Sequence, residues 1–493
     1  MSNLNVQQLA DLAWQSLENQ TEEKAEVVLG QWLLANGSDP VVLHWRALLL
    51  RALDRRGEAI ALLDQAAPLS PGNPAIALAL AQIGFEAGLP SSHNFEAALR
   101  LAPTSGEARL GLIAAYFAEG HGEQALALLG GALTSNPGWQ EGYRQYAQLA
   151  TLLGRPGQAL APLFQGIDRF PDALPLQLDA LEMLMAAGDY AAAIELSDRS
   201  LKRLGQMPQL LLRKATALDE LNRTAEAEAL FELCGAPVDV VHASRMIRHL
   251  LRRGRAQAAL ELAQPWLQGG QATEIWPYVT LAWRMLDDPR VDWLEGQKGL
   301  VATYDLGESV VDWPVLAARL RQIHAVSGQF ANQSVSGGTQ TDGPLFARID
   351  PEIALTRQIV VEALQNHLAG LPPHDAHHPQ LASRRDRRVR FSGSWSVRLN
   401  GQGFHRYHHH PQGWFSAVLY VAVPDGLQRM DGQLALGGSP PELGLPINPL
   451  QHVEPMPGRL VVFPSTMWHA TEPFSEGERM TIAFDLARPF EET

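Results

Sequence analysis

The stretch GRPGQALAPLFQGIDRFP, residues 154–171, begins with a glycine that recurs along the first half of the chain at a fixed step. Gly120, Gly154, Gly188 and Asn222 are each 34 residues apart. An alanine and a proline of the same stretch belong to two further series with that step: Ala125, Ala159, Ala193 and Ala227, and Pro103, Pro137 and Pro171. Three series with one period predict a repeated structural unit.

Each repeat has the pattern of two amphipathic helices. The Gly or Asn ends the first helix, because it readily adopts the left-handed conformation there. The small alanine lets the second helix pack closely on the first, and the proline stops the second helix. Less regular copies occupy residues 57–71 and 252–266.

This pattern resembles the tetratricopeptide repeat family, roughly over residues 8–235 and in weaker form toward residue 290. The resemblance implies an α-helical solenoid with a concave face that binds peptides or protein segments. An array that only scaffolds or dimerises the chain is the alternative.

Length and charge limit the classes of protein. The chain has 493 residues, of which 46% are apolar, and this is enough for at least two domains. Its 53 acidic and 39 basic residues give a net charge of −14, which argues against a general nucleic-acid binder. The basic run RRDRRVR, residues 384–390, is interpreted as a solvated loop or as a local patch for an acidic substrate.

Cellular location is inferred from what the chain lacks. Cys234 is the only cysteine, so no intramolecular disulfide can form and a reducing compartment is compatible. The start of the chain has no secretory signal pattern, and no apolar run reaches about 18 residues. We therefore expect a cytoplasmic protein that does not cross a membrane.

The pattern changes after about residue 300. Helical spacing continues through residues 276–296 without a Gly/Ser linker, which predicts that the last helices of the array pack on the C-terminal part of the chain. Two more helices are expected at 313–326 and 351–373. Short strands rich in β-branched and aromatic residues are expected at 394–400, 415–424, 458–464 and 479–487. The sequence thus predicts an α+β multidomain protein, with a helical repeat domain at 1–295 and a β-sandwich or jelly-roll domain at 296–493.

Histidines are concentrated in this second part. The stretch GFHRYHHHPQGWFS, residues 403–416, contains four of them within six positions. On a strand, His408 and His410 share one face, and His409 points to the other. Two imidazoles on one face can hold adjacent positions around a metal ion, and His469 is the best candidate for a third ligand. Polar surface for the pair, and a satisfied core histidine for His469, are the alternatives.

Ten residues after His469, Arg479 opens the strand RMTIAFDLA. Alternation places Arg479 on one face with Thr481, Ala483 and Asp485. A cation beside small polar side chains is a good setting for a carboxylate ligand. The same alternation turns His405 away from the metal site, unless a bulge breaks it.

These features together resemble the iron(II)/2-oxoglutarate oxygenases, in particular a bacterial branch often fused behind tetratricopeptide repeats. The resemblance covers about residues 325–488, and its matching stretches are QSVSGGTQT (333–341), SGSWSVRL (392–399), GFHRYHHHPQGW (403–414), PGRLVVFPSTMWHAT (457–471) and RMTIAFDLA (479–487). It implies a double-stranded β-helix, the jelly roll of these enzymes, with Fe(II), 2-oxoglutarate and O₂ as cofactor and cosubstrates. It also implies metal ligation by His408, His410 and His469, and binding of the 2-oxoglutarate C5 carboxylate by Arg479.

One position departs from the wider superfamily. The H-x-H-P pair of the family that the chain resembles falls on His408 and His410. Most oxygenases of the superfamily have Asp where this chain has His410, so ligation by His410 and the identity of the metal stay open. No catalytic side chain is expected beyond the metal centre. The further candidates for cosubstrate contacts, which core or turn roles would explain equally, are Thr481, Asn400 and Tyr420.

Substrate contacts are expected first in the Gly-rich stretch QSVSGGTQTDG, residues 333–343, which is interpreted as a flexible loop or as a lid. The candidates for substrate binding are Gln333, Thr339, Gln340, Thr341, Trp395 and Trp468. The repeat array suggests a peptide or protein substrate. A non-catalytic scaffold with a relic metal site, and a three-His cupin-type enzyme that does not use 2-oxoglutarate, are the rival functions.

Overall fold

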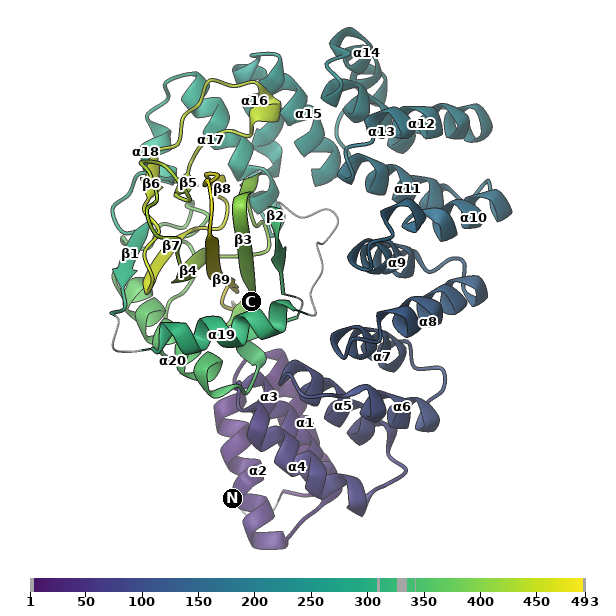
Figure 1. Ribbon diagram of the computed structural model, residues 1–493, viewed down its shortest axis with the longest axis vertical. Helices are drawn as coiled ribbons and strands as arrows, with labels where there is room; N and C mark the ends of the chain where they lie inside the picture. The colour runs from purple at the N-terminus through teal and green to yellow at the C-terminus, as the bar shows by residue number, and fades with distance from the viewer. Residues whose placement is uncertain (1–3, 308–310, 326–334, 342, 491–493) are drawn as a thin grey trace. The chain divides into compact units, whose positions relative to one another are not determined.

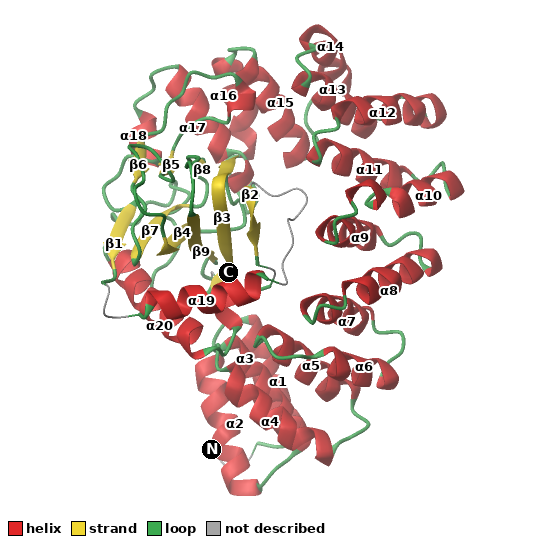
Figure 2. Cartoon of the chain, viewed as in Figure 1, coloured by secondary structure: helices red, strands yellow, loops and turns green. Residues whose placement is uncertain are grey.

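A computed structural model describes residues 4–307, 311–325, 335–341 and 343–490 (Figures 1 and 2). Helices fill the first part of the chain: α1 (Val6–Glu18), α2 (Glu22–Asn36), α3 (Pro40–Ala52), α4 (Arg56–Leu69), α5 (Pro74–Glu86), α6 (Ser92–Leu101), α7 (Gly106–Ala118), α8 (Gly122–Ser135), α9 (Gln140–Leu152), α10 (Ala161–Arg169), α11 (Leu174–Ala186), α12 (Tyr190–Leu204), α13 (Pro208–Glu220), α14 (Thr224–Cys234), α15 (Val240–Arg252), α16 (Ala256–Ala263), α17 (Trp276–Met285) and α18 (Arg290–Leu294). Two later helices are α19 (Trp313–His324) and α20 (Pro351–Ala369). The predicted helical array and both later helices are confirmed.

The periodic residues occupy the places that their chemistry predicts. Gly120, Gly154, Gly188 and Asn222 follow the first helix of their repeats with φ of 83°, 74°, 76° and 58°. These values lie in the left-handed region, where Gly and Asn are the favoured residues. The three prolines of the series closely follow α6, α8 and α10.

Ala159 departs from its series. It is only partly buried, whereas the other alanines of the series are almost fully buried. A short 3₁₀ helix (Pro156–Gln158) precedes it, and α10 starts at Ala161 with Pro162 in its first turn. Because proline lacks an N–H and its ring crowds the preceding turn, Pro162 disfavours one continuous α-helix from residue 156.

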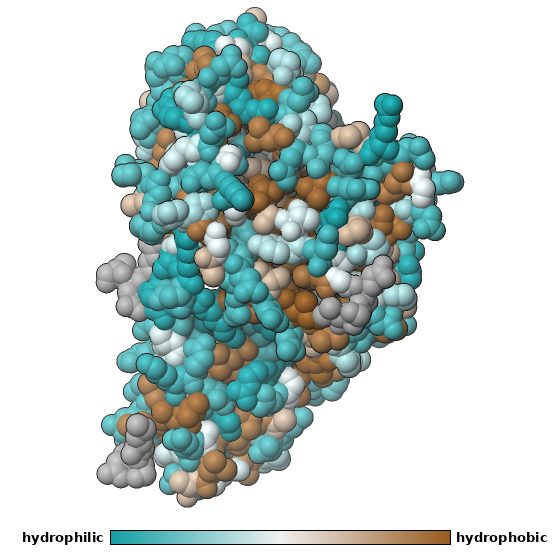
Figure 3. Space-filling view, turned by 90° about the vertical axis from the view of Figure 1, so that its left-hand side faces the viewer, coloured by the Kyte–Doolittle hydropathy of each residue, from teal (hydrophilic) through white to brown (hydrophobic). Residues whose placement is uncertain are grey.

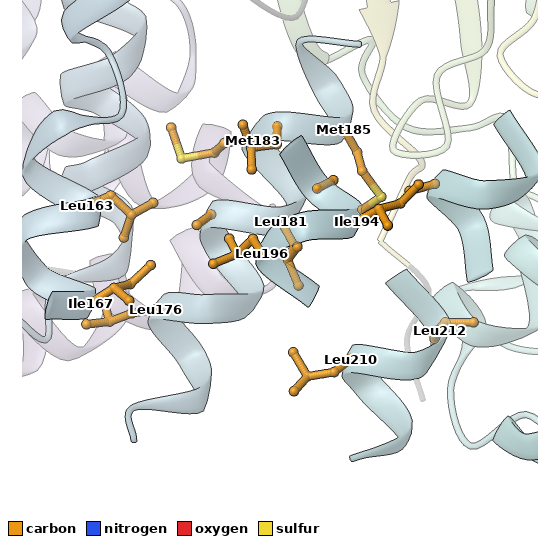
Figure 4. Close-up of a cluster of buried hydrophobic side chains, with 14 of the residues drawn as sticks. Leu163, Ile167, Leu176, Leu181, Met183, Met185, Ile194, Leu196, Leu210 and Leu212 are labelled. Atoms are coloured by element: carbon orange, nitrogen blue, oxygen red, sulfur yellow. The ribbon is translucent and has the colours of Figure 1, made fainter. Parts of the chain in front are cut away.

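The apolar faces of successive helices form a continuous core. In the part between residues 133 and 231, Leu163 of α10, Leu181 of α11, Leu196 of α12 and Leu210 of α13 are each at most 3% exposed (Figure 4). A single helix pair could not bury such a face alone, so stacking on its neighbours stabilises each repeat.

The first helices form one unit with a segment from far along the chain. Among the described residues, 343–361 cluster with 4–128. Within this unit the Arg357 guanidinium forms an ion pair with Asp54, and the Ile349 N–H donates to the Ala87 carbonyl at 3.2 Å. The Arg348 guanidinium lies so close to Gly88 that a Cβ there would approach it within 2.4 Å. The sequence pattern did not predict this packing.

The second part of the chain forms one antiparallel sheet of nine strands in the described residues. The strands are β1 (Ala302–Asp305), β2 (Val335–Gln340), β3 (Phe391–His408), β4 (Phe415–Ala422), β5 (Leu434–Leu436), β6 (Gln451–Val453), β7 (Arg459–Pro464), β8 (His469–Thr471) and β9 (Glu478–Leu486). Their order is β1-β7-β4-β9-β3-β8-β5-β6, with β2 also paired to β3. The sheet curls over on itself, as the double-stranded β-helix prediction requires (Figure 1).

Two features of the sheet correct the expectations. The described part of the Gly-rich stretch is a strand, β2, rather than a loop. Its glycines allow close approach instead of motion, because a Cβ at Gly338 would lie 2.4 Å from the Arg398 carbonyl oxygen. Strand β3 is also longer than predicted and bends at Gln402, whose φ is 70°, so that its first part pairs with β9 and its last part with β8.

Helices α15 to α18 pack on the sheet region, as the missing linker predicted. Trp468 and Leu443 belong to the same buried cluster as residues of these helices, and the Trp468 indole N–H donates to the Pro277 carbonyl at 2.8 Å. Arg284 of α17 donates to the Asn448 carbonyl at 2.7 Å. The domain boundary at residue 295 stays a prediction.

The surface shown in Figure 3 is largely hydrophilic, with hydrophobic residues scattered between. Across the described residues, no helix is long and apolar enough to cross a membrane. In the basic run, Arg384 pairs with Asp386, and Arg385 donates to the carbonyls of Leu371 and Pro372. The run is therefore tied to neighbouring structure and is not a fully solvated loop.

Candidate metal centre

A cavity of about 200 Å³ lies inside the curl of the sheet. Strands β3, β4, β8 and β9 supply most of its walls. His408 at the end of β3, His410 in the turn after that strand, and His469 at the start of β8 all line it. In register, His408 lies directly opposite His469.

The three imidazoles cluster closely. Each can offer a nitrogen such that the three atoms lie within 4.8 Å of one another. The ring centroids of His408 and His469 are 4.2 Å apart, and the His410 centroid is 5.1 Å from each. Nitrogen ligands about 2.0–2.2 Å from one ion would lie closer together than this, so the three rings would move toward one another when a metal binds.

Hydrogen bonds define the tautomer of each ring. His408 Nδ1 is 2.7 Å from the Arg406 carbonyl oxygen, and His469 Nδ1 is 3.0 Å from the Met467 carbonyl oxygen. His410 Nδ1 lies 2.8 and 2.7 Å from the two carboxylate oxygens of Asp485. Since these oxygens can only accept, each Nδ1 carries the proton and each Nε2 carries the lone pair that a metal binds.

Burial favours the neutral form of two of these rings, His408 and His469. Removal from water lowers the pKa of His408 to about 3 and that of His469 well below its usual range, with a further contribution from the neighbouring imidazoles. Neutral imidazole is the form that ligates metals, so at neutral pH these two donors need no deprotonation.

Arg479 lines the same cavity and is only 2% exposed. Its Nε donates to the Gly432 carbonyl at 3.1 Å, and its guanidinium lies 4.8 Å from the centre of the Tyr420 ring. No Asp or Glu among the described residues pairs with it. A buried guanidinium without a carboxylate partner is costly, so the cavity is suited to an anionic ligand. Thr481 lines the wall beside it.

Comparison with known proteins identifies the two parts. Residues 393–485 match the family described as "Putative 2OG-Fe(II) oxygenase", and residues 93–149 match the tetratricopeptide repeat family. The chain joins tetratricopeptide repeats to a 2OG-Fe(II) oxygenase domain. Both resemblances predicted from the sequence are confirmed. No curated protein sequence matches the chain.

Solved structures show similar folds at low identity. A prolyl-4-hydroxylase from Pseudomonas putida has 20% identity, with 38% of this chain and 92% of that one covered and a TM-score of 0.27. Yeast Tom70 has 18% identity, coverage of 56% and 60%, and a TM-score of 0.35. MamA from Desulfovibrio magneticus RS-1 has 15% identity, coverage of 34% and 97%, and a TM-score of 0.31.

The donor set of the oxygenase domain fits iron(II). Imidazole is a suitable ligand for iron, zinc, copper and nickel, and three nitrogen ligands leave coordination positions for a cosubstrate and O₂.

His405 adds a fourth imidazole to the cavity wall, with its ring centroid 5.7 Å from that of His408. The expectation that His405 turns away is wrong, because the register between β3 and β8 shifts between His405 and His408. His409 does turn away, and its ring lies edge-on to Trp468 at 4.7 Å.

Two of the predicted substrate contacts lie at the cavity of the oxygenase domain. Gln340 and Trp395 both line it, and the Trp395 ring lies 5.6 Å from that of His410. Tyr420, predicted to contact the cosubstrate, is fully buried beneath Arg479, and its hydroxyl has no hydrogen-bond partner among the described residues.

The structure places four other candidates away from the cavity. Asn400 is exposed at the end of the β3–β9 ladder. The Thr339 hydroxyl lies 2.9 Å from His324 Nδ1, and the Thr341 hydroxyl accepts from the Ser396 N–H at 2.9 Å. Trp468 packs against α17 through its hydrogen bond to the Pro277 carbonyl. Gln333 lies outside the described residues.

Sequence reasoning put Asp485 on the Arg479 face of β9 but gave it no role. Its carboxylate accepts from His410 Nδ1, and the Ser416 hydroxyl donates to the same carboxylate at 2.6 Å. The signal was the alternation itself, because Arg479, Thr481, Ala483 and Asp485 all line the cavity.

Proposed function

We propose that this protein is an iron(II)- and 2-oxoglutarate-dependent dioxygenase that hydroxylates a peptide or protein. The single observation that carries the proposal is the pairing, in one cavity, of three clustered imidazoles with a buried arginine that has no carboxylate partner among the described residues. The first feature suits a metal ion, and the second suits a dicarboxylate cosubstrate bound beside it.

When bound, iron and 2-oxoglutarate would supply the oxidising chemistry, in which O₂ and 2-oxoglutarate yield succinate, CO₂ and one oxygen atom inserted into the substrate. His408, His410 and His469 would hold the ion through Nε2. The hydrogen bonds at their Nδ1 atoms fix each ring in the orientation that this requires.

Arg479 would bind the distal carboxylate of 2-oxoglutarate with its planar guanidinium. The carbonyl of Gly432 and the ring of Tyr420 hold that guanidinium in place. The buried Tyr420 hydroxyl, which lacks a partner among the described residues, and Thr481 are candidate donors to the same carboxylate. Burial of this end of the cavity would keep water away and strengthen the ion pair between Arg479 and the distal carboxylate of 2-oxoglutarate.

The substrate class is inferred from architecture. Tetratricopeptide repeats usually bind protein segments, so the array would recruit a peptide or protein, and Gln340 and Trp395 would contact it at the cavity. A cytoplasmic location, inferred from the sequence, is part of the proposal.

A second candidate is a three-His metalloenzyme that does not use 2-oxoglutarate. The observation in its favour is that the clustered donors are three histidines, with His410 at the position where most oxygenases of the wider superfamily have Asp. Arg479 argues against it, because an enzyme without an acidic cosubstrate gains nothing from a buried guanidinium that lacks a carboxylate partner among the described residues.

The test is formation of succinate from 2-oxoglutarate by protein loaded with Fe(II), in air, with and without candidate peptides. His469→Ala should abolish turnover. His409→Gln is the matched control, because His409 lies between two of the proposed ligands in sequence but faces Trp468. Turnover that requires metal but not 2-oxoglutarate would favour the three-His alternative, and absence of turnover with every peptide and without one would favour a non-catalytic scaffold.

A further inference from the structure

The carboxylate of Asp485 faces one imidazole of the cluster. Asp485 is 8% exposed, and both of its oxygens lie within hydrogen-bond distance of His410 Nδ1, at 2.8 and 2.7 Å. It is not one of the three side chains whose donor atoms cluster. It contacts His410 at Nδ1, so it lies behind the ring as seen from the Nε2 that would face the metal.

The surroundings of Asp485 hold it there. The Ser416 hydroxyl donates to its Oδ1 at 2.6 Å and lies 3.0 Å from the Ser465 hydroxyl, and both serines are at most 2% exposed. Gly413 makes room for this arrangement, since a Cβ there would lie 2.4 Å from the Ser465 hydroxyl and 3.3 Å from the Asp485 Cβ. Within the described residues no Lys or Arg pairs with Asp485, so no fixed positive charge neutralises its carboxylate.

The other two imidazoles have different partners. His408 and His469 donate their Nδ1–H to the backbone carbonyls of Arg406 and Met467, which carry no net charge. Within the described residues, His410 is the member of the cluster that donates to a carboxylate. An anionic acceptor draws the Nδ1 proton toward itself and makes Nε2 a stronger donor to a cation.

We propose that Asp485 is a positioning residue that places a negative charge behind His410, in a ligand cluster that contains no carboxylate. In this arrangement the negative charge lies one hydrogen bond away from the imidazole that would hold the metal. The three-His set then has, at the metal, an environment closer to that of two histidines and one carboxylate. The inference rests on the proposed function, because it assumes that the cluster holds a divalent metal.

The experiment measures Co(II) affinity without oxygen, by competition with a chelator, in the full-length protein. Asp485→Asn keeps an oxygen acceptor of the same size and removes the charge, and Asp485→Ala removes both. We expect Asp485→Asn to weaken Co(II) binding by about 10- to 100-fold and Asp485→Ala by at least as much. Ser416→Ala, which leaves the charge in place, should have a smaller effect.

Glu478→Gln is the matched control. Glu478 lies on the same strand, and its carboxylate pairs with Arg321 and Arg398 instead of a cluster histidine. The Glu478→Gln variant removes one negative charge from β9, as Asp485→Asn does. It should leave Co(II) affinity within about threefold of wild type, as expected for an ion pair near the surface.

A second measurement distinguishes an effect that passes through His410 from a general effect of Asp485→Asn on the fold. In a His410→Gln background, with two imidazoles left, Asp485→Asn should change the weaker Co(II) affinity little, because its route to the metal is gone. Equal losses in both backgrounds, or an unchanged affinity in Asp485→Asn, would overturn the inference while leaving the oxygenase proposal intact. If the wild-type protein binds no Co(II), both the inference about Asp485 and the proposed function are wrong.

Discussion

Arg479→Ala tests the part of the proposal that separates a 2-oxoglutarate enzyme from other metalloenzymes. Arg479 is 2% exposed, and no carboxylate among the described residues pairs with it, so a bound 2-oxoglutarate would be its main ionic partner. Removing one member of a buried charge pair costs about 2–5 kcal/mol. At about 1.4 kcal/mol per factor of ten, this predicts an affinity for 2-oxoglutarate lower by about 30-fold to a few thousand-fold.

Arg479→Lys should be intermediate, because an ammonium group keeps the charge but lacks the planar fork that matches a carboxylate. The assay is calorimetric titration of 2-oxoglutarate into Co(II)-loaded wild type and both variants, without oxygen. Co(II) affinity serves as the folding control and should stay nearly unchanged, since Arg479 is not among the clustered donors. A 2-oxoglutarate affinity in Arg479→Ala equal to that of wild type would refute the reasoning and favour the three-His alternative.

Three further predictions concern buried groups of the second part of the chain. Burial lowers the pKa of His367 to about 4, so the folded state binds fewer protons than the unfolded state between pH 6.5 and 4, and stability is lost as pH falls through that range. Between pH 7.5 and 4.5, the unfolding free energy of His367→Phe should fall by about 2–3 kcal/mol less than that of wild type, as measured by urea unfolding. Burial raises the pKa of Glu295 to about 7, so its contribution is present at acid pH and is lost as pH rises toward 7. Glu295→Gln should therefore be more stable than wild type by about 2–3 kcal/mol at pH 8 but not at pH 4.5, and equal stability at both pH values would contradict this. Trp468→Ala should lower the free energy of unfolding by about 3–5 kcal/mol, because it removes a buried side chain and its hydrogen bond to α17. Thermal unfolding measures this, and a melting temperature equal to that of wild type would contradict it.

The repeats could be predicted because their signal is local and recurs. A glycine that must adopt positive φ, a small packing residue and a helix-ending proline each leave a mark within a few positions. The longer strands were predictable for the same reason, since β4, β7 and β9 are long enough to show a run of β-branched and aromatic residues. Strands β5, β6 and β8 have three residues each, which is too short for a recognisable alternation.

The alternation of side chains along a strand predicted part of the site. His408 and His410 share the cavity, and so do the four residues of β9. The turn of His405 into the cavity depends on a register shift between strands, which no local pattern encodes. The contact of His410 with Asp485 joins residues 75 positions apart. It depends on how the turn after β3 lies over β9, which sequence alone does not show.

Every step of the proposed chemistry depends on one divalent metal ion held by His408, His410 and His469 through imidazole nitrogen. Titration of Co(II) into the full-length protein without oxygen, followed by the visible absorption of the bound ion, measures this binding. We expect one Co(II) per chain in wild type and in His409→Gln, and an affinity lower by at least about 100-fold in His469→Ala, since one of three ligands is lost. Equal Co(II) binding by His469→Ala and wild type would show that these histidines do not form the metal site.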